Sequence, residues 1–195
     1  MRGRSDPAAA LLCGVPNADA PPRMNVFLVG PMGSGKSAVG RQLAQRLALE
    51  FIDSDHEIEA RTGVDIAYIF EREGEAGFRS REAEVIDAIT RRERVLVATG
   101  GGAVLDAGTR ERLRARGRVV YLRTSVDQQL ARTRRSDDRP LLRNDDPRGT
   151  LERLFEQRTP LYTEVAEIVV DTDGRKVKTV VDQICRQLGV EGPQP

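Results

Sequence analysis

The stretch from Gly30 to Ser37 constrains this chain more than any other. It reads Gly-Pro-Met-Gly-Ser-Gly-Lys-Ser, which is the G-x-x-x-x-G-K-S pattern of a phosphate-binding P-loop. The apolar run Asn25–Val29 before it is typical of a buried parallel strand. After it, Val39, Leu43 and Leu47 recur at every fourth position, as on the buried face of a helix. A strand, a glycine-rich loop and a helix in this order predict a site for a nucleoside triphosphate.

The chemistry of phosphate binding explains the residue types in this loop. Glycines permit backbone angles that other residues rarely adopt, so that successive N–H groups converge on phosphate oxygens. The N-terminus of the following helix adds the positive end of its dipole. Lys36 can reach the β- and γ-phosphates, and the Ser37 hydroxyl can ligate Mg²⁺. We expect the ATP contacts of the loop at Gly33, Ser34, Gly35, Lys36, Ser37 and Ala38.

Length and composition fit a single α/β domain with its own core. The chain has 195 residues and a formal net charge of +1, which gives no general reason to expect nucleic acid or an anionic membrane as a partner. Apolar runs are all shorter than a membrane span. Cys13 and Cys185, the two cysteines, lie far apart and indicate neither a metal site nor a disulfide framework. We expect a cytoplasmic monomer that binds small molecules.

The two ends of the chain are expected to lie outside the folded domain. Residues 1–23 contain four prolines and many alanines, and their apolar run is too short and weak for a signal peptide. We interpret them as a disordered leader, or as the product of a start codon assigned too far upstream. The domain then spans residues 24–190, and a short tail follows at 191–195.

The segment Glu50–Asp55 reads as a short strand that ends in two carboxylates, Asp53 and Asp55. In an open α/β sheet, ligands bind beyond the carboxyl ends of the strands, so both side chains are expected at the site. The next strand ends in Thr99 rather than in an aspartate, which makes Asp53 the better candidate to hold Mg²⁺, directly or through a metal-bound water. Ser54 or Asp55 can also cap the following helix, and capping explains one carboxylate but not both.

Two helices are expected over residues 64–73 and 75–92, with a stop at Gly74 between them. Arg79 and Glu82 lie three residues apart in the second helix and can form an ion pair, which by default is an ordinary solvated one.

The strand over residues 94–98 runs into three glycines, Gly100, Gly101 and Gly102. Glycines at a strand end cost backbone entropy and bury nothing, so they suit a place where a ligand approaches the main chain closely. A plain flexible turn is the alternative.

The region 133–148 is polar, contains prolines and several arginines including Arg139, and has few apolar residues to anchor it. Such segments beside P-loops commonly close over phosphates, and we expect a lid here. A helix follows from Thr150 to about Glu164, with an expected interruption at Pro160. The last helix, from Val177 to Leu188, shows the clearest helical periodicity of the chain.

Five predicted strands alternate with helices, and the P-loop follows the first strand. This pattern predicts an α/β three-layer sandwich, in which helices cover both faces of a five-stranded parallel sheet. The strand order common in small P-loop kinases is 2-3-1-4-5. The chain lacks the Asn-Lys-x-Asp element of guanine specificity, which argues against a GTPase switch.

In combination these motifs resemble those of the shikimate kinases, from about Met24 to Leu188. The P-loop alone is specific, whereas the other motifs gain their specificity from their order and spacing. Those motifs are Asp53-Ser-Asp55, Gly74-Glu75 with Phe78-Arg79 and Glu82, Gly100-Gly101-Gly102, Arg139-Pro140-Leu141-Leu142 and Arg158-Thr-Pro-Leu-Tyr162.

The resemblance implies transfer of the γ-phosphoryl group of ATP to the 3-hydroxyl of shikimate, a step of aromatic amino-acid biosynthesis, with Mg²⁺ as cofactor. It assigns Asp55 to the acceptor hydroxyls, and Arg79 and Arg158 to the shikimate carboxylate. Glu82 would orient Arg79, and Gly100 to Gly102 would line the same pocket. The acceptor-binding part would cover residues 54–92.

The resemblance also assigns residues to the ATP side of the site. Arg139 would come from the lid onto the phosphates and, with Lys36 and Asp55, would make up the catalytic set. Arg132 and the segment after Asp171, which contains Arg175, would flank the adenine.

Physical chemistry favours these roles independently, because a carboxylate substrate suits the planar, bidentate guanidinium of arginine better than lysine. Two alternatives stay open. A related kinase acting on a hydroxy-acid such as gluconate would share the P-loop but need not share the other motifs. A nucleotide-dependent switch without transfer activity would need no acceptor pocket, which the aspartate pair and the basic lid both predict.

Overall fold

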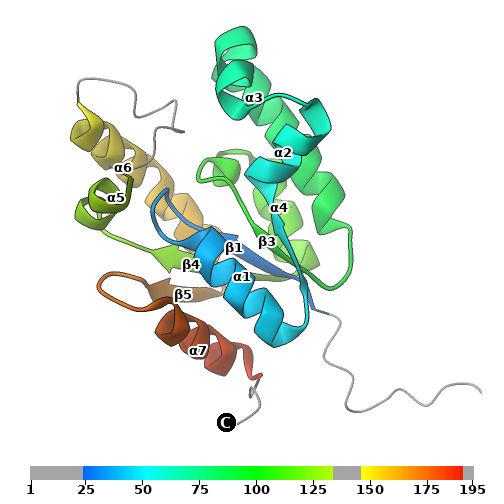
Figure 1. Ribbon diagram of the computed structural model, residues 1–195, viewed down its shortest axis with the longest axis vertical. Coiled ribbons are helices and arrows are strands. Elements are labelled where there is room, and N and C mark those ends of the chain that lie inside the picture. The colour runs from blue at the N-terminus through cyan, green and yellow to red at the C-terminus, as the bar shows by residue number, and fades with distance from the viewer. Residues whose placement is uncertain (1–23, 134–145, 191–195) are drawn as a thin grey trace, which may run out of the picture.

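The computed structural model describes residues 24–133 and 146–190, and its centre is a five-stranded parallel sheet (Figure 1). The strands cross the sheet in the order β2-β3-β1-β4-β5, and each neighbouring pair is parallel. The predicted fold class and strand order are therefore confirmed. The strands are β1 (Val26–Val29), β2 (Glu50–Asp53), β3 (Val95–Ala98), β4 (Arg118–Arg123) and β5 (Ile168–Asp171).

Helices connect the strands and cover the sheet on both faces. In chain order they are α1 (Lys36–Leu47), α2 (Ser54–Thr62), α3 (Ile66–Thr90), the 3₁₀ turn η1 (Ala103–Leu105), α4 (Ala107–Arg116), α5 (Val126–Thr133), α6 (Pro147–Val165) and α7 (Val177–Leu188). The expected leader, the expected tail and most of the expected lid, with Arg139, lie outside the described residues. None of the helices in the described part of the chain combines the length and apolar character that a membrane crossing needs.

The central strand β1 separates two hydrophobic cores, because successive residues of a strand point to opposite faces. Phe27 and Val29 pack with residues of α3, α4 and α6 on one face. Val26 and Leu28 pack with α1 and α7 on the other, where these two helices run side by side (Figure 1). All four β1 residues are fully buried, as a strand covered on both faces requires. The P-loop that follows β1 is thus anchored on a rigid base.

Of the two helix breaks expected from the sequence, one is present and one is absent. The expected stop at Gly74 is a sharp kink inside α3, where φ is 70°. Pro160 does not interrupt α6, which starts at Pro147 and continues to Val165, so the expected break there is wrong. A proline removes a single N–H group. Buried residues on both sides of Pro160, Arg158 and Tyr162 among them, hold the helix together through tertiary packing.

The expected cap of α2 is also wrong. Asp53, not Ser54 or Asp55, caps this helix, because its side chain accepts a hydrogen bond from the N–H of Asp55. The hydroxyl of Ser54 is buried and accepts a hydrogen bond from the N–H of Gly100 at 2.8 Å instead. The ends of β2 and β3 are therefore joined directly beside the cleft described below.

Candidate active site

The carboxyl ends of β1, β2 and β3 open into one cleft of about 360 Å³. Its walls come from the P-loop, the start of α2, helix α3, the glycines after β3, and α6. The cleft thus brings together motifs that lie more than a hundred residues apart in sequence. The predicted site residues that line it are Gly33, Gly35, Lys36, Ser37, Ala38, Asp53, Asp55, Arg79, Gly100, Gly101, Gly102, Arg132 and Arg158.

The P-loop has the backbone that phosphate binding requires. Gly30, Gly33 and Gly35 have φ values of 144°, 75° and 91°, a region that side chains rarely adopt. The helix α1 begins directly after Gly35, and no side chain caps its first N–H groups. The positive end of the helix dipole at this terminus suits an anion. Ser34 is buried beneath the loop rather than on the cleft wall.

Lys36 lies across the loop that carries it. Its Nζ donates hydrogen bonds to the carbonyl oxygens of Gly30 and Pro31, each at 2.8 Å. Lys36 also lines the cleft, so its positive charge lies at the phosphate end.

Ser37 and Asp53 form the oxygen-rich corner of the cleft. The Ser37 hydroxyl donates to Oδ2 of Asp53 at 2.7 Å, while Oδ1 of Asp53 accepts from the N–H of Asp55 at 3.2 Å. Mg²⁺ prefers oxygen ligands and usually takes one or two from the protein and the rest from water and phosphates. A hydroxyl and a carboxylate held together beside a P-loop fit this donor set.

Arg79 is fixed at the opposite end of the cleft by two carboxylates of α3. Its Nη1 donates to Oε2 of Glu82 at 2.6 Å, and its Nε and Nη2 donate to Oε1 of Glu75 at 3.3 and 3.0 Å. Burial of the guanidinium opposes its charge, but the ion pairs with Glu82 and Glu75 outweigh this and raise the pKa of Arg79. The Glu82 side of this ion pair is buried and the Arg79 side is 20% exposed, so it is not the solvated surface pair that three-residue spacing indicates by default.

Glu82 is the buried anion at the centre of this end, with 2% of its surface exposed. Burial raises the pKa of its carboxyl group, the nearby charges of Arg79 and Arg158 oppose that shift, and Asp55 adds to it. Among the described residues, neither Oε1 of Glu82 nor Nε of Arg158 has a hydrogen-bond partner. Unsatisfied buried polar atoms are costly, so their presence on a cleft wall favours a polar ligand there.

The triple glycine is held in place by hydrogen bonds and is not a flexible turn. The N–H of Gly100 donates to Ser54, and the carbonyl oxygen of Gly101 accepts from the buried Tyr162 hydroxyl. Tyr162 comes from α6, four residues after Arg158, so α6 supplies both a cleft arginine and a support for the glycine loop. Burial raises the pKa of this phenol, which keeps it a donor.

The three arginines predicted to contact ATP are Arg132, Arg139 and Arg175, and the two in the described part of the chain differ in where they lie relative to the cleft. Arg132 at the end of α5 donates to the carbonyl oxygens of Gly33, at 2.9 Å, and Thr172, at 3.0 Å, so it joins the P-loop to the segment after β5. Arg175 does not line the cleft; its guanidinium donates to the Asp171 carbonyl and to Gln183 of α7. Arg139 lies outside the described residues, and its role stays a prediction.

An apolar wall was not identified as part of the site from sequence. Ile66, Phe70 and Phe78 of α3 line the cleft together with Met32 of the P-loop. The Phe70 and Phe78 rings pack with centroids 4.8 Å apart, across the kink at Gly74. Helical spacing marked these residues as core-facing, and only the adjacency of Phe78 to Arg79 hinted that they face a ligand.

Comparison with known proteins identifies the family. The family model described as Shikimate kinase matches residues 32–189, which is most of the chain. The chain belongs to the shikimate kinase family. A shikimate kinase of Shewanella amazonensis is 57% identical over 167 residues, which cover 86% of this chain and 98% of that protein. The solved shikimate kinase of Acinetobacter baumannii in complex with shikimate is 48% identical, with a TM-score of 0.84, over 86% of this chain and 94% of that one.

More distant structures share the fold alone. A gluconokinase from Sinorhizobium meliloti superposes with a TM-score of 0.52 at 16% identity, over 86% of this chain and 92% of that one. The shikimate kinase match is therefore closer in both sequence and structure than the match to this kinase of a different hydroxy-acid.

Proposed function

We propose that this protein transfers the γ-phosphoryl group of ATP to the 3-hydroxyl of shikimate, giving shikimate 3-phosphate and ADP in aromatic amino-acid biosynthesis. The observation that carries the proposal is the two-ended cleft. One end is a P-loop for phosphates, and the other holds Arg79, Arg158 and Asp55, which suit a carboxylate and hydroxyl groups. Membership of the shikimate kinase family supports the same substrate.

The cleft residues divide the work between the two substrates. Arg79 and Arg158 would bind the shikimate carboxylate by charge-assisted hydrogen bonds, with Gly100 to Gly102 along the same wall. Asp55 would accept hydrogen bonds from the ring hydroxyls and hold the attacking oxygen toward the P-loop. Because phosphoryl transfer passes through a loose transition state, positioning and charge stabilisation matter more than base strength. Lys36 would stay close to the γ-phosphoryl group during transfer and stabilise its negative charge.

Ser37 and Asp53 would hold Mg²⁺ beside the ATP phosphates. Bound there, the cation neutralises phosphate charge and orients the β- and γ-phosphates for transfer. On the nucleotide side, Arg132 and the segment after β5 would flank the adenine. Arg175 is the weaker candidate in that segment, because its guanidinium is engaged by α7. Arg139 would meet the phosphates from the lid.

The decisive experiment measures ADP release from Mg·ATP with a panel of acceptors: shikimate, gluconate and nucleoside monophosphates. We expect turnover with shikimate and at most weak turnover with the others. Gluconate turnover equal to that with shikimate would favour the gluconate kinase alternative. Equal turnover with a nucleoside monophosphate would refute an acceptor site built for a hydroxy-acid. A cytoplasmic location and a monomeric state stay predictions, which cell fractionation and light scattering would test.

A further inference from the structure

Gly102 lies against the face of the Arg79 guanidinium. A Cβ atom built on Gly102 would stand equally far from Cζ, Nη1 and Nη2 of Arg79, and closer to each than real Cβ contacts allow. A point equidistant from these three atoms lies over the plane of the group, not beside its edge. The glycine therefore provides the surface on which the planar end of Arg79 rests.

The backbone at Gly102 does not itself require glycine. Its φ and ψ are −101° and −4°, which residues with side chains also adopt. In this respect Gly102 differs from Gly33 and Gly35 of the P-loop, whose positive φ values favour glycine whatever the surroundings. A side chain is excluded at position 102 because it would occupy the space that the Arg79 guanidinium fills.

The main chain around Gly102 has little freedom to move away. Its carbonyl oxygen accepts from the N–H of Leu105 at 2.9 Å, and that of Gly100 accepts from the N–H of Ala103 at 3.2 Å. These bonds close the turn η1, whose first two residues, Ala103 and Val104, are buried in the core. A side chain added at Gly102 would therefore displace the end of Arg79 and not the backbone.

Arg79 is able to yield, because only its far end is involved and its side chain is 20% exposed. It borders the substrate cleft and also a neighbouring hollow of about 270 Å³ between α3 and η1. Displacement would break the geometry set by Glu82 and Glu75 without opening a cavity in the core. The hydrophobic core would keep its packing, while the guanidinium would lose its orientation toward the cleft and the buried Glu82 would lose part of its ion pair.

We infer that Gly102 is a positioning residue for the acceptor carboxylate, which acts by seating the guanidinium of Arg79. This inference rests on the proposed function, because it takes Arg79 as a ligand of the shikimate carboxylate. From the sequence, the glycines of this loop are explained by close approach of a ligand to the main chain. Contact with Arg79 is an additional reason for glycine at position 102.

The test is the variant Gly102→Ala, compared with wild type by steady-state kinetics and thermal unfolding. We expect the KM for shikimate to rise about tenfold or more, as for loss of a charge-assisted hydrogen bond. The KM for ATP should stay near wild type. The melting temperature should fall by no more than in Arg79→Ala, which removes the ion pair of the buried Glu82 completely. Gly108→Ala is the matched control, since a Cβ there would also approach an arginine, Arg112, at 3.2 Å, but away from the cleft. It should leave both KM values unchanged.

A second variant separates positioning of Arg79 from any other effect of the added methyl group. In an Arg79→Ala background the seat has no guanidinium to hold, so Gly102→Ala should not lower kcat/KM for shikimate further. A full additional loss in that background would overturn the inference, as would a Gly102→Ala enzyme with a wild-type KM. Absence of shikimate turnover by the wild-type protein would instead refute the proposed function, and the inference with it.

Discussion

The hydroxyl of Ser37 and the carboxylate of Asp53 are joined by a hydrogen bond of 2.7 Å between the start of α1 and the end of β2. The second oxygen of the same carboxylate caps α2, whose next residue in the site is Asp55. One aspartate thus links the phosphate loop to the acceptor-binding helix. A carboxylate with both oxygens engaged has a fixed orientation, which suits a metal position that must not shift between the two substrates.

Asp53→Asn should raise the Mg²⁺ concentration needed for half-maximal activity by about tenfold or more, a typical cost of disturbing the residues around a bound metal. Asparagine keeps an oxygen for the α2 cap but loses the charge. Titrating activity with Mg²⁺ at saturating ATP measures this. Asp65→Asn makes the same chemical change at another cap, where Asp65 accepts from the N–H of Tyr68, and should leave the requirement unchanged. An unaltered requirement in Asp53→Asn would remove this residue from the metal site.

Asp55→Asn should lower kcat by about a hundredfold or more, within the range seen when a group that handles a proton is lost. The amide still accepts a hydrogen bond from a hydroxyl, but it can neither take a proton nor orient the attacking oxygen equally well. The KM for ATP should stay near wild type. If Asp55→Asn changed the Mg²⁺ requirement and Asp53→Asn changed kcat alone, the roles given to the two aspartates would be exchanged.

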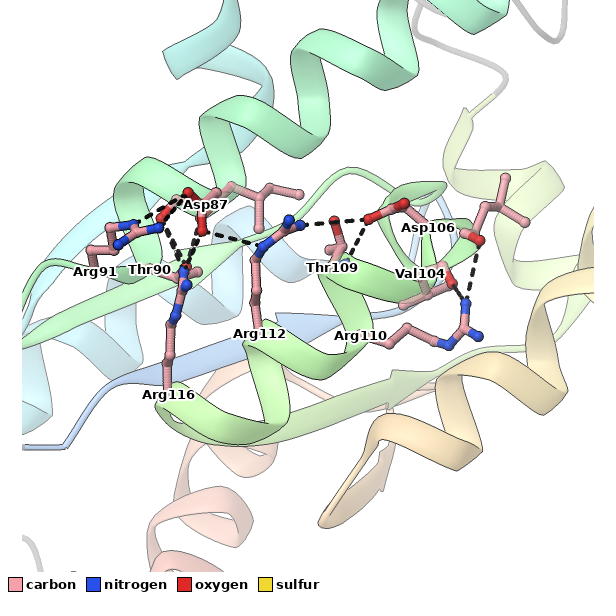
Figure 2. A network of polar contacts seen from close by, with 11 residues as sticks. Asp87, Thr90, Arg91, Val104, Asp106, Thr109, Arg110, Arg112 and Arg116 are labelled. Carbon is pink, nitrogen blue, oxygen red and sulfur yellow. Dashed lines mark hydrogen bonds and ion pairs between the residues drawn. The ribbon is translucent and has the colours of Figure 1, made fainter.

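Arg79→Lys and Arg158→Lys should each raise the KM for shikimate by roughly tenfold to a hundredfold, because a bidentate contact worth about 1.5–3 kcal/mol is lost. The KM for ATP should barely change. Arg110→Lys is a suitable control, since this arginine of α4 is also largely buried but donates to the Val104 carbonyl of η1 (Figure 2). A rise in the KM for ATP would place the affected arginine on the phosphate side.

Lys36→Ala should reduce kcat by about a thousandfold or more, since it removes a preorganised cation from the path of the transferred group. The hydrogen bonds of Lys36 to Gly30 and Pro31 join residues of the same loop, so the fold should persist. Single-turnover assays and circular dichroism would establish both points, with Lys178→Ala on the exposed side of α7 as the control. Near-normal turnover would refute the phosphate-binding role of the loop.

Local patterns were sufficient to predict the frame of this protein. The P-loop signature, the β-branched strands and the helical spacing each depend on neighbours in sequence, and they predicted the parallel sheet and its helices. The order common in small P-loop kinases then supplied the correct strand order. The rule that ligands bind at the carboxyl ends of strands then predicted, from the sequence, that Asp53 and Asp55 lie near Lys36. All three residues line the cleft.

Features that depend on three-dimensional packing were not predictable in this way. The continuity of α6 through Pro160 comes from burial of residues that the sequence does not show to be neighbours. Gly102 is constrained by Arg79, which is 23 residues earlier and on another element, so its spacing carries no signal. The same holds for Tyr162, whose hydroxyl supports Gly101 across 61 positions.

Outside the cleft, Asp87 organises the contact between α3 and α4 (Figure 2). Its Oδ1 lies 2.8 Å from Nη1 of Arg116 and 3.2 Å from Nε of Arg112, while its Oδ2 accepts from Arg91 at 3.0 Å. The hydrogen bonds to Arg116 and Arg91 lower the pKa of Asp87 below its ordinary value of 3.8. Helix α3 carries Arg79 and Glu82, so this network supports the helix that holds the acceptor end of the cleft.

Asp87→Asn should therefore destabilise the protein at neutral pH and have little effect in acid. A carboxyl group whose pKa is lower in the folded state stabilises it above the unfolded pKa, and that contribution is lost as pH falls through the folded value. The gap between the urea midpoints of wild type and Asp87→Asn should thus be constant above about pH 5 and close below pH 3.8. Asp127→Asn, which breaks an exposed ion pair with Arg148, should show a smaller gap at neutral pH. A gap for Asp87→Asn that persisted undiminished in strong acid would mean that the side chain acts through its shape and not its charge.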